Sequence, residues 1–156
     1  MKWPWLSGRF WIILSDLIQN MTNNNSKKDI ACIEQIKIDL LEAIEYKYHG
    51  KRNIDIIIKQ PEFTSVCPMT GLPDFGCITI RYKPDSKIIE LKSLKLYLLQ
   101  YRNVGIFYEH LVNHLLDDLV KVLEPFYMQV EGDFTARGGI TTRVTAAYNP
   151  EGGEIE

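Results

Sequence analysis

Residues 106–148 read IFYEHLVNHLLDDLVKVLEPFYMQVEGDFTARGGITTRVTAAY and hold the strongest helical pattern of the chain, followed by its clearest hairpin. Apolar residues recur at helical spacing as far as Leu123, which predicts a long helix. Residues 126–131 and 140–148 then alternate apolar and polar side chains, which predicts two strands. The glycine pair 138–139 between them permits the positive φ angles of a tight turn, so we expect a β-hairpin.

The residues upstream predict a helix, a strand and a long loop. Residues 29–45 carry isoleucines and leucines at helical spacing with charged residues between them, which predicts an N-terminal helix. Residues 53–59 are rich in isoleucine and predict a strand. Three prolines and a glycine interrupt residues 60–75, so we expect a long loop there and no regular element.

A further hairpin and a short helix complete the pattern. Residues 78–83 alternate, and a Pro-Asp-Ser turn leads to a second apolar run at 88–89, which predicts a hairpin. A short helix follows and ends near Asn103. This order predicts an α+β fold with a four-stranded antiparallel sheet and two helices on one face. Because such a sheet leaves open edges, we also expect a homo-oligomer.

The composition bounds the class of protein. With 156 residues, of which 46% are hydrophobic and 24% charged, the chain is one ordinary soluble domain rather than a disordered segment. The formal net charge of −2 argues against a nucleic-acid partner. Three cysteines without the spacing of a disulfide framework or zinc site indicate a reducing, cytoplasmic compartment. His110 and His114 lie four residues apart but have no third ligand, so we expect no metal.

Residues 1–28 form an N-terminal extension and polar linker in this interpretation, and residues 29–156 form a single domain. Arg9 and Asp16 interrupt the apolar run near the start, so no stretch is long enough to span a bilayer. The order of residues does not match a signal peptide either, and we expect no membrane partner. Alternatively, Met21 is the natural start and the preceding segment is an extension or a docking helix.

Cys67 and Asp74 are the first candidates for chemistry. Both belong to the proline-broken loop, seven residues apart, where a carboxylate can fold back towards a thiol. A thiol nucleophile with a general acid or base is consistent with this pattern. The structural alternatives are a small hydrophobic side chain under a loop and an aspartate that serves a turn.

Glu109 and a pair of lysines are the other candidates. Glu109 falls within the apolar arc of the long helix, where a carboxylate needs a donor. It could accept two hydrogen bonds from the edge of a guanine-type base, or it could serve only the helix dipole. Lys92 and Lys95 lie three residues apart at the start of the short helix, which suits a phosphate but also describes a solvated pair.

Four segments closely resemble the signature motifs of the QueF family, the NADPH-dependent 7-cyano-7-deazaguanine reductases. They are EFTSVCPMTGLPDF at 62–75, ELKSLKLY at 90–97, YRNVGIFYE at 101–109 and GDFTARGGI at 132–140. The likeness covers roughly residues 46 to 148, and the chain length suits the short, single-domain type.

The resemblance implies the tunnelling fold, or T-fold, in which several subunits close a barrel and active sites lie between neighbours. It implies a four-electron reduction of the nitrile of 7-cyano-7-deazaguanine to 7-aminomethyl-7-deazaguanine, in queuosine biosynthesis for tRNA modification. The implied cofactor is NADPH. The chain has no G-x-G-x-x-G motif, so this cofactor assignment comes from the resemblance and the basic residues alone.

The same resemblance implies a role for each candidate. Cys67, as a thiolate, would add to the nitrile carbon and form a covalent thioimide, and Asp74 would donate protons to the nitrogen. The residues that would hold the base are Ile89, Glu90, Leu91, Tyr108 and Glu109. Those that would hold the NADPH phosphates are Lys92, Lys95 and Arg137.

Two positions depart from the family pattern. Tyr108 stands where well-known members carry histidine, although its phenol can still form a hydrogen bond, and Met69 replaces a commonly basic residue. The alternative from another class is a protein that binds a pterin or purine-like base, with Cys67 incidental. That alternative predicts binding without consumption of NADPH.

Overall fold

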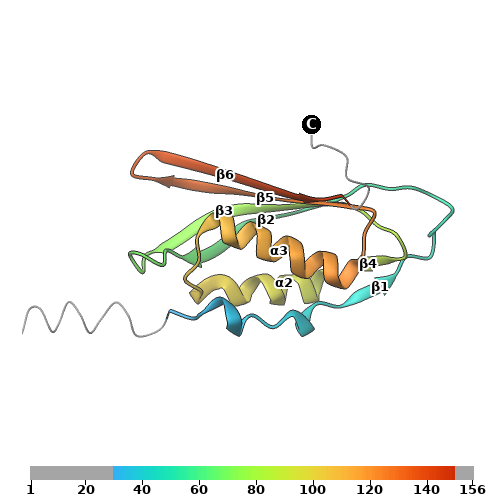
Figure 1. Cartoon of the computed structure of the whole chain (residues 1–156), viewed down its shortest axis with the longest axis horizontal. Coiled ribbons are helices and arrows are strands. Elements are labelled where there is room, and N and C mark those ends of the chain that lie inside the picture. Colours follow the sequence, from blue (N-terminus) through green and yellow to red (C-terminus); the bar gives the residue numbers. More distant parts are fainter. Residues whose placement is uncertain (1–29, 150–156) are drawn as a thin grey trace, which may run out of the picture. The chain divides into compact units, whose positions relative to one another are not determined.

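The computed structural model describes residues 30–149, and residues 31–149 belong to one compact unit. Its elements, in chain order, are η1 (Ile33–Gln35), η2 (Ile38–Leu40), β1 (Ala43–Glu45), β2 (Ile56–Val66), β3 (Pro73–Lys83), β4 (Lys87–Ile89), α2 (Leu91–Leu99), η3 (Gln100–Asn103), α3 (Tyr108–Leu123), β5 (Tyr127–Arg137) and β6 (Ile140–Tyr148). This arrangement of antiparallel strands and a few helices confirms the α+β class (Figure 1).

The main sheet has four strands in the order β2-β3-β5-β6, and each neighbouring pair is antiparallel. α2 and α3 cover one face of this sheet, as the sequence predicts (Figure 1). The β5–β6 hairpin is also confirmed, and Gly138 and Gly139 in its turn have φ of 59° and 85°. β1 and β4 form a separate two-stranded sheet.

The core lies between α3 and the middle strands of the sheet. α3 buries one apolar stripe, which consists of Leu111, Val112, Leu115, Leu116, Leu119 and Leu123. Gly132 on β5 lets the helix come close, because a Cβ there would lie 3.0 Å from Val112 and 2.6 Å from the Phe134 ring. The helix ends at Glu124, whose φ of 48° is left-handed, and Pro125 follows it.

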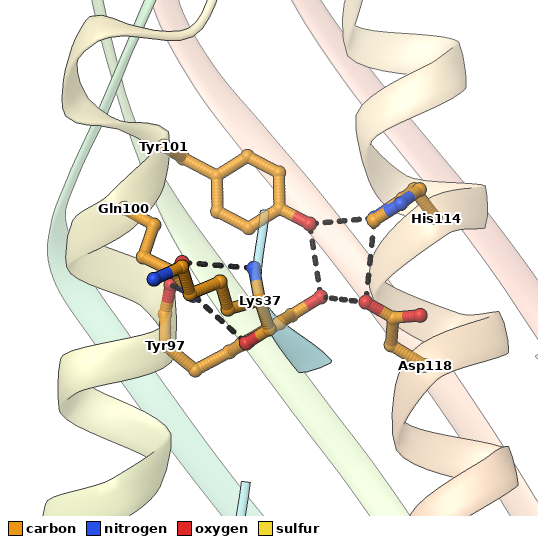
Figure 2. A network of polar contacts seen from close by, with 6 residues as sticks. All are labelled: Lys37, Tyr97, Gln100, Tyr101, His114 and Asp118. Atoms are coloured by element: carbon orange, nitrogen blue, oxygen red, sulfur yellow. Dashed lines mark hydrogen bonds and ion pairs between the residues drawn. The ribbon is translucent and has the colours of Figure 1, made fainter. Parts of the chain in front are cut away.

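A buried polar network ties α2 and η3 to α3 (Figure 2). The Tyr97 hydroxyl donates to Asp118 at 2.6 Å and lies 2.9 Å from the Tyr101 hydroxyl, which in turn contacts His114 Nδ1 at 2.7 Å. Burial is the main reason why the pKa of Tyr97 and that of Tyr101 are raised, so both phenols keep their protons. The network therefore holds α2 and η3 in a defined position against α3.

The predicted N-terminal helix is wrong over residues 30–45. Two short 3₁₀ turns, η1 and η2, and the strand β1 occupy these residues. The backbone groups that a helix would use are bonded to other elements. Lys37 exchanges two hydrogen bonds with the Gln100 side chain, the Glu42 N–H donates to Ser93 Oγ, and the Glu42 carbonyl accepts from the Glu90 N–H. The isoleucines and leucines of this stretch pack against the core without a helical backbone.

The predicted loop over residues 60–75 is also wrong, because β2 continues to Val66 and β3 begins at Pro73. β2 is an edge strand, where Pro61 is tolerated, and the register shifts by one residue between Gln60 and Phe63. Pro73 opens β3, a position that also suits proline. Only residues 67–72 lie outside the strands.

The predicted hairpin over 78–89 is wrong as well. β3 pairs with β2 and β5, whereas β4 leaves the main sheet and pairs with β1, with Ile89 opposite Ala43. Alternation shows that a segment is a strand but does not identify its partner. Within residues 30–149, no helix is long and apolar enough to cross a membrane.

Candidate active site

A short turn between β2 and β3 carries Cys67. The Cys67 N–H donates to the Leu72 carbonyl at 2.9 Å, and the Gly71 N–H donates back to the Cys67 carbonyl at 2.8 Å. Gly71 has a φ of 71°, which few other residues adopt without strain. The preceding residue, Val66, forms two backbone hydrogen bonds to the segment before α3. Its N–H donates to the Val104 carbonyl at 3.0 Å, and its carbonyl accepts from the Ile106 N–H at 3.1 Å. The turn is therefore held against the start of α3.

The thiol of Cys67 is 4% exposed and lies among hydrogen-bond donors. Burial raises its pKa. The hydroxyl and N–H of Thr70, the N–H of Met69 and the Arg137 side chain favour the thiolate and together outweigh burial, so the pKa falls to about 7. A cysteine with this pKa is about half ionised at neutral pH, which suits a nucleophile.

Asp74 lies on β3, 5% exposed, and forms an ion pair with Arg137. Arg137 is the last residue of β5, and its side chain is 48% exposed. Ser65 stands opposite Asp74 in the β2–β3 register and is fully buried. Its hydroxyl has no hydrogen-bond partner among residues 30–149. A buried carboxylate with a cationic partner is therefore placed near the same turn as the thiol.

Aromatic rings form one wall of the site. Tyr108 stacks on Phe134 with 3.7 Å between ring centroids and 7° between planes, and Arg137 Nη2 lies 3.4 Å from the Tyr108 hydroxyl. Burial raises the pKa of Tyr108, and the negative charges of Cys67 and Glu109 raise it further. A pocket of about 220 Å³ opens beside these groups and is lined by Tyr108, Thr135, Arg137, Ile140 and Thr142.

Glu109 is exposed at the first turn of α3, so the expectation that it lies among apolar residues is wrong for the single chain. The helical pattern places it in the apolar arc, and Leu111 of the same turn is fully buried, but no part of the described chain covers Glu109. Phe107, the residue before α3, is 47% exposed as well. Glu109 is therefore open to solvent next to Tyr108.

The other predicted substrate and cofactor residues gather at the start of α2. Ile89 is buried and its N–H donates to the Tyr82 hydroxyl at 3.1 Å, whereas Leu91 is 61% exposed. Glu90 caps α2, because its carboxylate accepts from the N–H groups of Lys92 and Ser93 at 2.9 and 2.6 Å. These bonds lower the pKa of Glu90. Lys92 and Lys95 lie on the exposed side of the same helix.

The two groups of predicted residues lie at opposite ends of α3. Lys87, just before Ile89, lies 3.2 Å from Glu124 at the end of α3. Glu109 stands 15 residues earlier, at the start of that helix. At 1.5 Å per residue, Glu109 and Glu124 lie about 22 Å apart along the helix axis. The structure thus brings Cys67, Asp74, Tyr108 and Arg137 together and keeps the α2 group apart from them.

Thr70 and Phe134 belong to this site although sequence reasoning gave them no role. Both lie within quoted motifs, but only the fold shows that Thr70 donates to the sulfur and that Phe134 supports Tyr108. Among the described residues, His, Cys, Asp and Glu form no group of three or more that could hold a metal ion. Of the other thiols, Cys32 is exposed, outside any helix or strand, and Cys77 is half-buried on β3.

Known proteins share both sequence and fold with this chain. The family described as QueF-like protein matches residues 73–152. A protein of Caldicellulosiruptor bescii is 57% identical over 77% of this chain and 91% of its own length, and one of Elusimicrobium minutum is 48% identical over 86% and 98%. Both are named NADPH-dependent 7-cyano-7-deazaguanine reductase.

The chain belongs to the QueF family. A solved structure, the archaeosine synthase QueF-Like in its apo form, superposes with a TM-score of 0.54 and covers 61% of this chain and 91% of its own. Its sequence identity is 22%, so this likeness concerns the fold alone. The family membership predicted from the motifs and the α+β class predicted from the order of elements are both confirmed.

The pKa of Cys67 can be tested by alkylation in a Cys32→Ser, Cys77→Ala background. Because the thiolate is the reactive form, the iodoacetamide rate should rise with pH around a midpoint of about 7. Thr70→Val removes the hydroxyl donor and should move the midpoint towards the ordinary thiol value of about 8.5.

Thr145→Val, on the exposed surface of β6, is the matched control and should leave the midpoint unchanged. A midpoint at or above the ordinary value in the parent chain would show that the donors around Cys67 do not favour its thiolate.

Proposed function

We propose that this chain reduces the nitrile of 7-cyano-7-deazaguanine to the primary amine 7-aminomethyl-7-deazaguanine, with NADPH, in queuosine biosynthesis. The observation that carries the proposal is the buried Cys67 thiol with a pKa of about 7, close to the Asp74–Arg137 pair. Its QueF-family relatives are named for this reaction. The free thiols Cys32, Cys67 and Cys77 suit a reducing compartment, and we place the reaction in the cytoplasm.

Cys67 is the nucleophile and Asp74 handles the protons in this proposal. The thiolate sulfur bonds to the nitrile carbon, one π bond of the nitrile opens, and the nitrogen takes a proton from Asp74, which yields a neutral thioimide. Bound NADPH would supply hydride, of which two are required to take the nitrile to the amine. After the first hydride reaches the thioimide carbon, the C–S bond breaks and Cys67 leaves as the thiolate. The imine that remains takes the second hydride and one further proton, and Asp74 regains its own proton from solvent.

The residues present suit a cofactor that carries phosphates. Arg137 is half exposed beside a pocket whose other lining residues include the hydroxyl-bearing Tyr108, Thr135 and Thr142. Guanidinium and hydroxyl groups are the usual donors to phosphate. Lys92 and Lys95 present two ammonium groups on the exposed side of α2. We assign the cofactor phosphates to these three basic residues.

The base site needs a second copy of the chain in this proposal. Tyr108 and Glu109 lie at the Cys67 end of α3, whereas Ile89, Glu90 and Leu91 follow Lys87, which pairs with Glu124 at the other end of that helix, about 22 Å along its axis from Glu109. A neighbouring subunit that presents its α2 start to the Cys67 end would bring both sets around one base. We therefore propose a T-fold barrel of several subunits with active sites between neighbours.

The reaction is tested by an NADPH-oxidation assay with 7-cyano-7-deazaguanine and identification of the product by mass spectrometry. We expect two NADPH consumed for each amine formed, complete loss of activity in Cys67→Ala, and retained activity in Cys77→Ala, since Cys77 lies outside the site. Binding of the base without any oxidation of NADPH would refute the reductase and support a base-binding protein instead.

The shared site is tested by mixing two inactive variants, Cys67→Ala and Glu90→Asn. Asparagine keeps the cap of α2 but removes the carboxylate. If the two groups meet only between subunits, unfolding and refolding the variants together should restore about one quarter of the sites for equal, random mixing.

Each variant refolded alone is the control and should stay inactive. If the mixture also stays inactive while its subunits exchange, as mass spectrometry of isotope-labelled chains would show, each site is built within one chain and the proposed interface is wrong.

A further inference from the structure

Residues 103–106, which connect η3 to α3, lie alongside the end of β2. Backbone hydrogen bonds of 3.0 and 3.1 Å join this connector to Val66, and bonds of 2.7 and 3.1 Å join its other side to Ala31. Val66 directly precedes Cys67. The position of the thiol therefore depends on the position of the connector.

Tyr101, in η3 just before the connector, also contacts β2. Its fully buried ring lies 5.9 Å from the Phe63 ring, measured between centroids, with 50° between the planes. Phe63 is the first paired residue of β2 after the register shift. Tyr101 and the connector thus hold β2 at both ends of residues 63–66, the stretch that leads to the Cys67 turn.

The Tyr101 hydroxyl belongs to the network of Figure 2, and the number of hydrogens there fixes the direction of each bond. A carboxylate only accepts, so the single hydrogen of the Tyr97 hydroxyl goes to Asp118 at 2.6 Å. The Tyr97 oxygen, 2.9 Å from that of Tyr101, must then accept from it. This bond uses the one hydrogen of Tyr101, whose oxygen therefore accepts from His114 Nδ1 at 2.7 Å.

Every bond of this network is made only if His114 carries a hydrogen on Nδ1. With a hydrogen on Nε2 alone, Tyr101 would have one hydrogen for two acceptors, and its contact with either His114 or Tyr97 would lack one. Both phenols are fully buried, where an unmade hydrogen bond is costly. The chain of donors therefore runs from His114 through Tyr101 and Tyr97 to Asp118.

We propose that Tyr101 is a positioning residue for Cys67, and that the Nδ1 hydrogen of His114 is the donor that holds Tyr101 in place. This inference rests on the proposed function in one respect, because it takes Cys67 to be the nucleophile. It goes further in giving a role in that chemistry to a network that contains none of the residues assigned to substrate or cofactor.

The Cys67 thiolate depends on the shape of its turn. The donors that favour the thiolate include the hydroxyl and N–H of Thr70, which lies within the turn that two backbone bonds close over residues 67–72. These donors reach the sulfur only while the turn keeps this shape, whereas the thiol stays buried when β2 shifts slightly. A displaced connector should therefore raise the pKa of Cys67.

The test measures the rate of Cys67 alkylation by iodoacetamide against pH in the Cys32→Ser, Cys77→Ala chain. Tyr101→Phe keeps the ring against Phe63 but removes the hydroxyl that ties η3 to α3. We expect the midpoint to rise from about 7 and the rate at pH 7 to fall about twofold, because fewer thiols are ionised at that pH.

Two substitutions of His114 separate the hydrogen from the ring. His114→Leu removes the donor and should raise the midpoint as Tyr101→Phe does. His114→Asn places an amide N–H near the position of Nδ1 and should restore the midpoint of the parent chain. A His114→Asn chain that behaves as His114→Leu does would overturn the role of the Nδ1 hydrogen.

Tyr46→Phe is the matched control. Tyr46 is also a buried tyrosine, and its hydroxyl donates to the Arg52 carbonyl at 3.2 Å, but this bond lies outside the connector and the network. Both tyrosine variants should lower the unfolding temperature, because each loses a hydrogen bond of a buried residue. Only Tyr101→Phe should move the midpoint.

An unchanged midpoint in Tyr101→Phe would overturn the proposal, and so would an equal shift in Tyr46→Phe, which would show a general loosening of the chain. If Tyr101→Phe does not fold, the two His114 variants carry the same test. Alkylation requires neither the base nor NADPH, so failure of the proposed reductase is seen separately, in the NADPH-oxidation assay.

Discussion

One extra residue in β2 decides which way Cys67 points. Up to Gln60 the even-numbered residues of this strand face the helices, with Ile56 and Ile58 packed against the core. Gln60 pairs with Ile78, and Phe63 pairs with Gly76. Between these two pairs β2 advances by three residues and β3 by two, so β2 contains one extra residue. After this bulge the odd-numbered residues Phe63, Ser65 and Cys67 are the buried ones. Without it the thiol would face the other side of the sheet.

Asp74 faces the same side of the sheet as Cys67, because β2 and β3 keep the same pairing from the bulge to the turn. Ser65 stands opposite Asp74, and Cys67 closes the turn on Leu72. The carboxylate and the thiol are thereby buried together, which would be costly for two acidic groups without a cation. Arg137 supplies that cation from the far end of β5, and β3 pairs with both β2 and β5. The site thus depends on the order of strands in the sheet as much as on any single loop.

The sequence predicted the elements whose signal is local. α3, α2 and the β5–β6 hairpin follow from periodicity and from the Gly138–Gly139 turn. Residues 30–45 have the same periodicity but form no helix, because Gln100 and Ser93 take their backbone hydrogen bonds. The pairing of β4 with β1 and the continuation of β2 through Pro61 depend on distant partners, which a pattern along the chain does not contain.

The same distinction applies to the site. Cys67, Asp74 and Arg137 were predicted from their motifs, and the fold brings them together. The donors that lower the pKa of Cys67 and the stacking of Tyr108 on Phe134 appear only in three dimensions. The wheel position of Glu109 predicted burial, but nothing in the single chain covers that side of the first turn of α3, although Leu111 in the same turn is buried.

The most direct test of the account is the intact mass of the protein after incubation with 7-cyano-7-deazaguanine in the absence of NADPH. The account predicts a gain of one molecule of the base per reactive site, located on the peptide that contains Cys67 and absent from Cys67→Ala. An unchanged mass under conditions where calorimetry shows the base to be bound would contradict it, because the buried thiol would then not be the nucleophile.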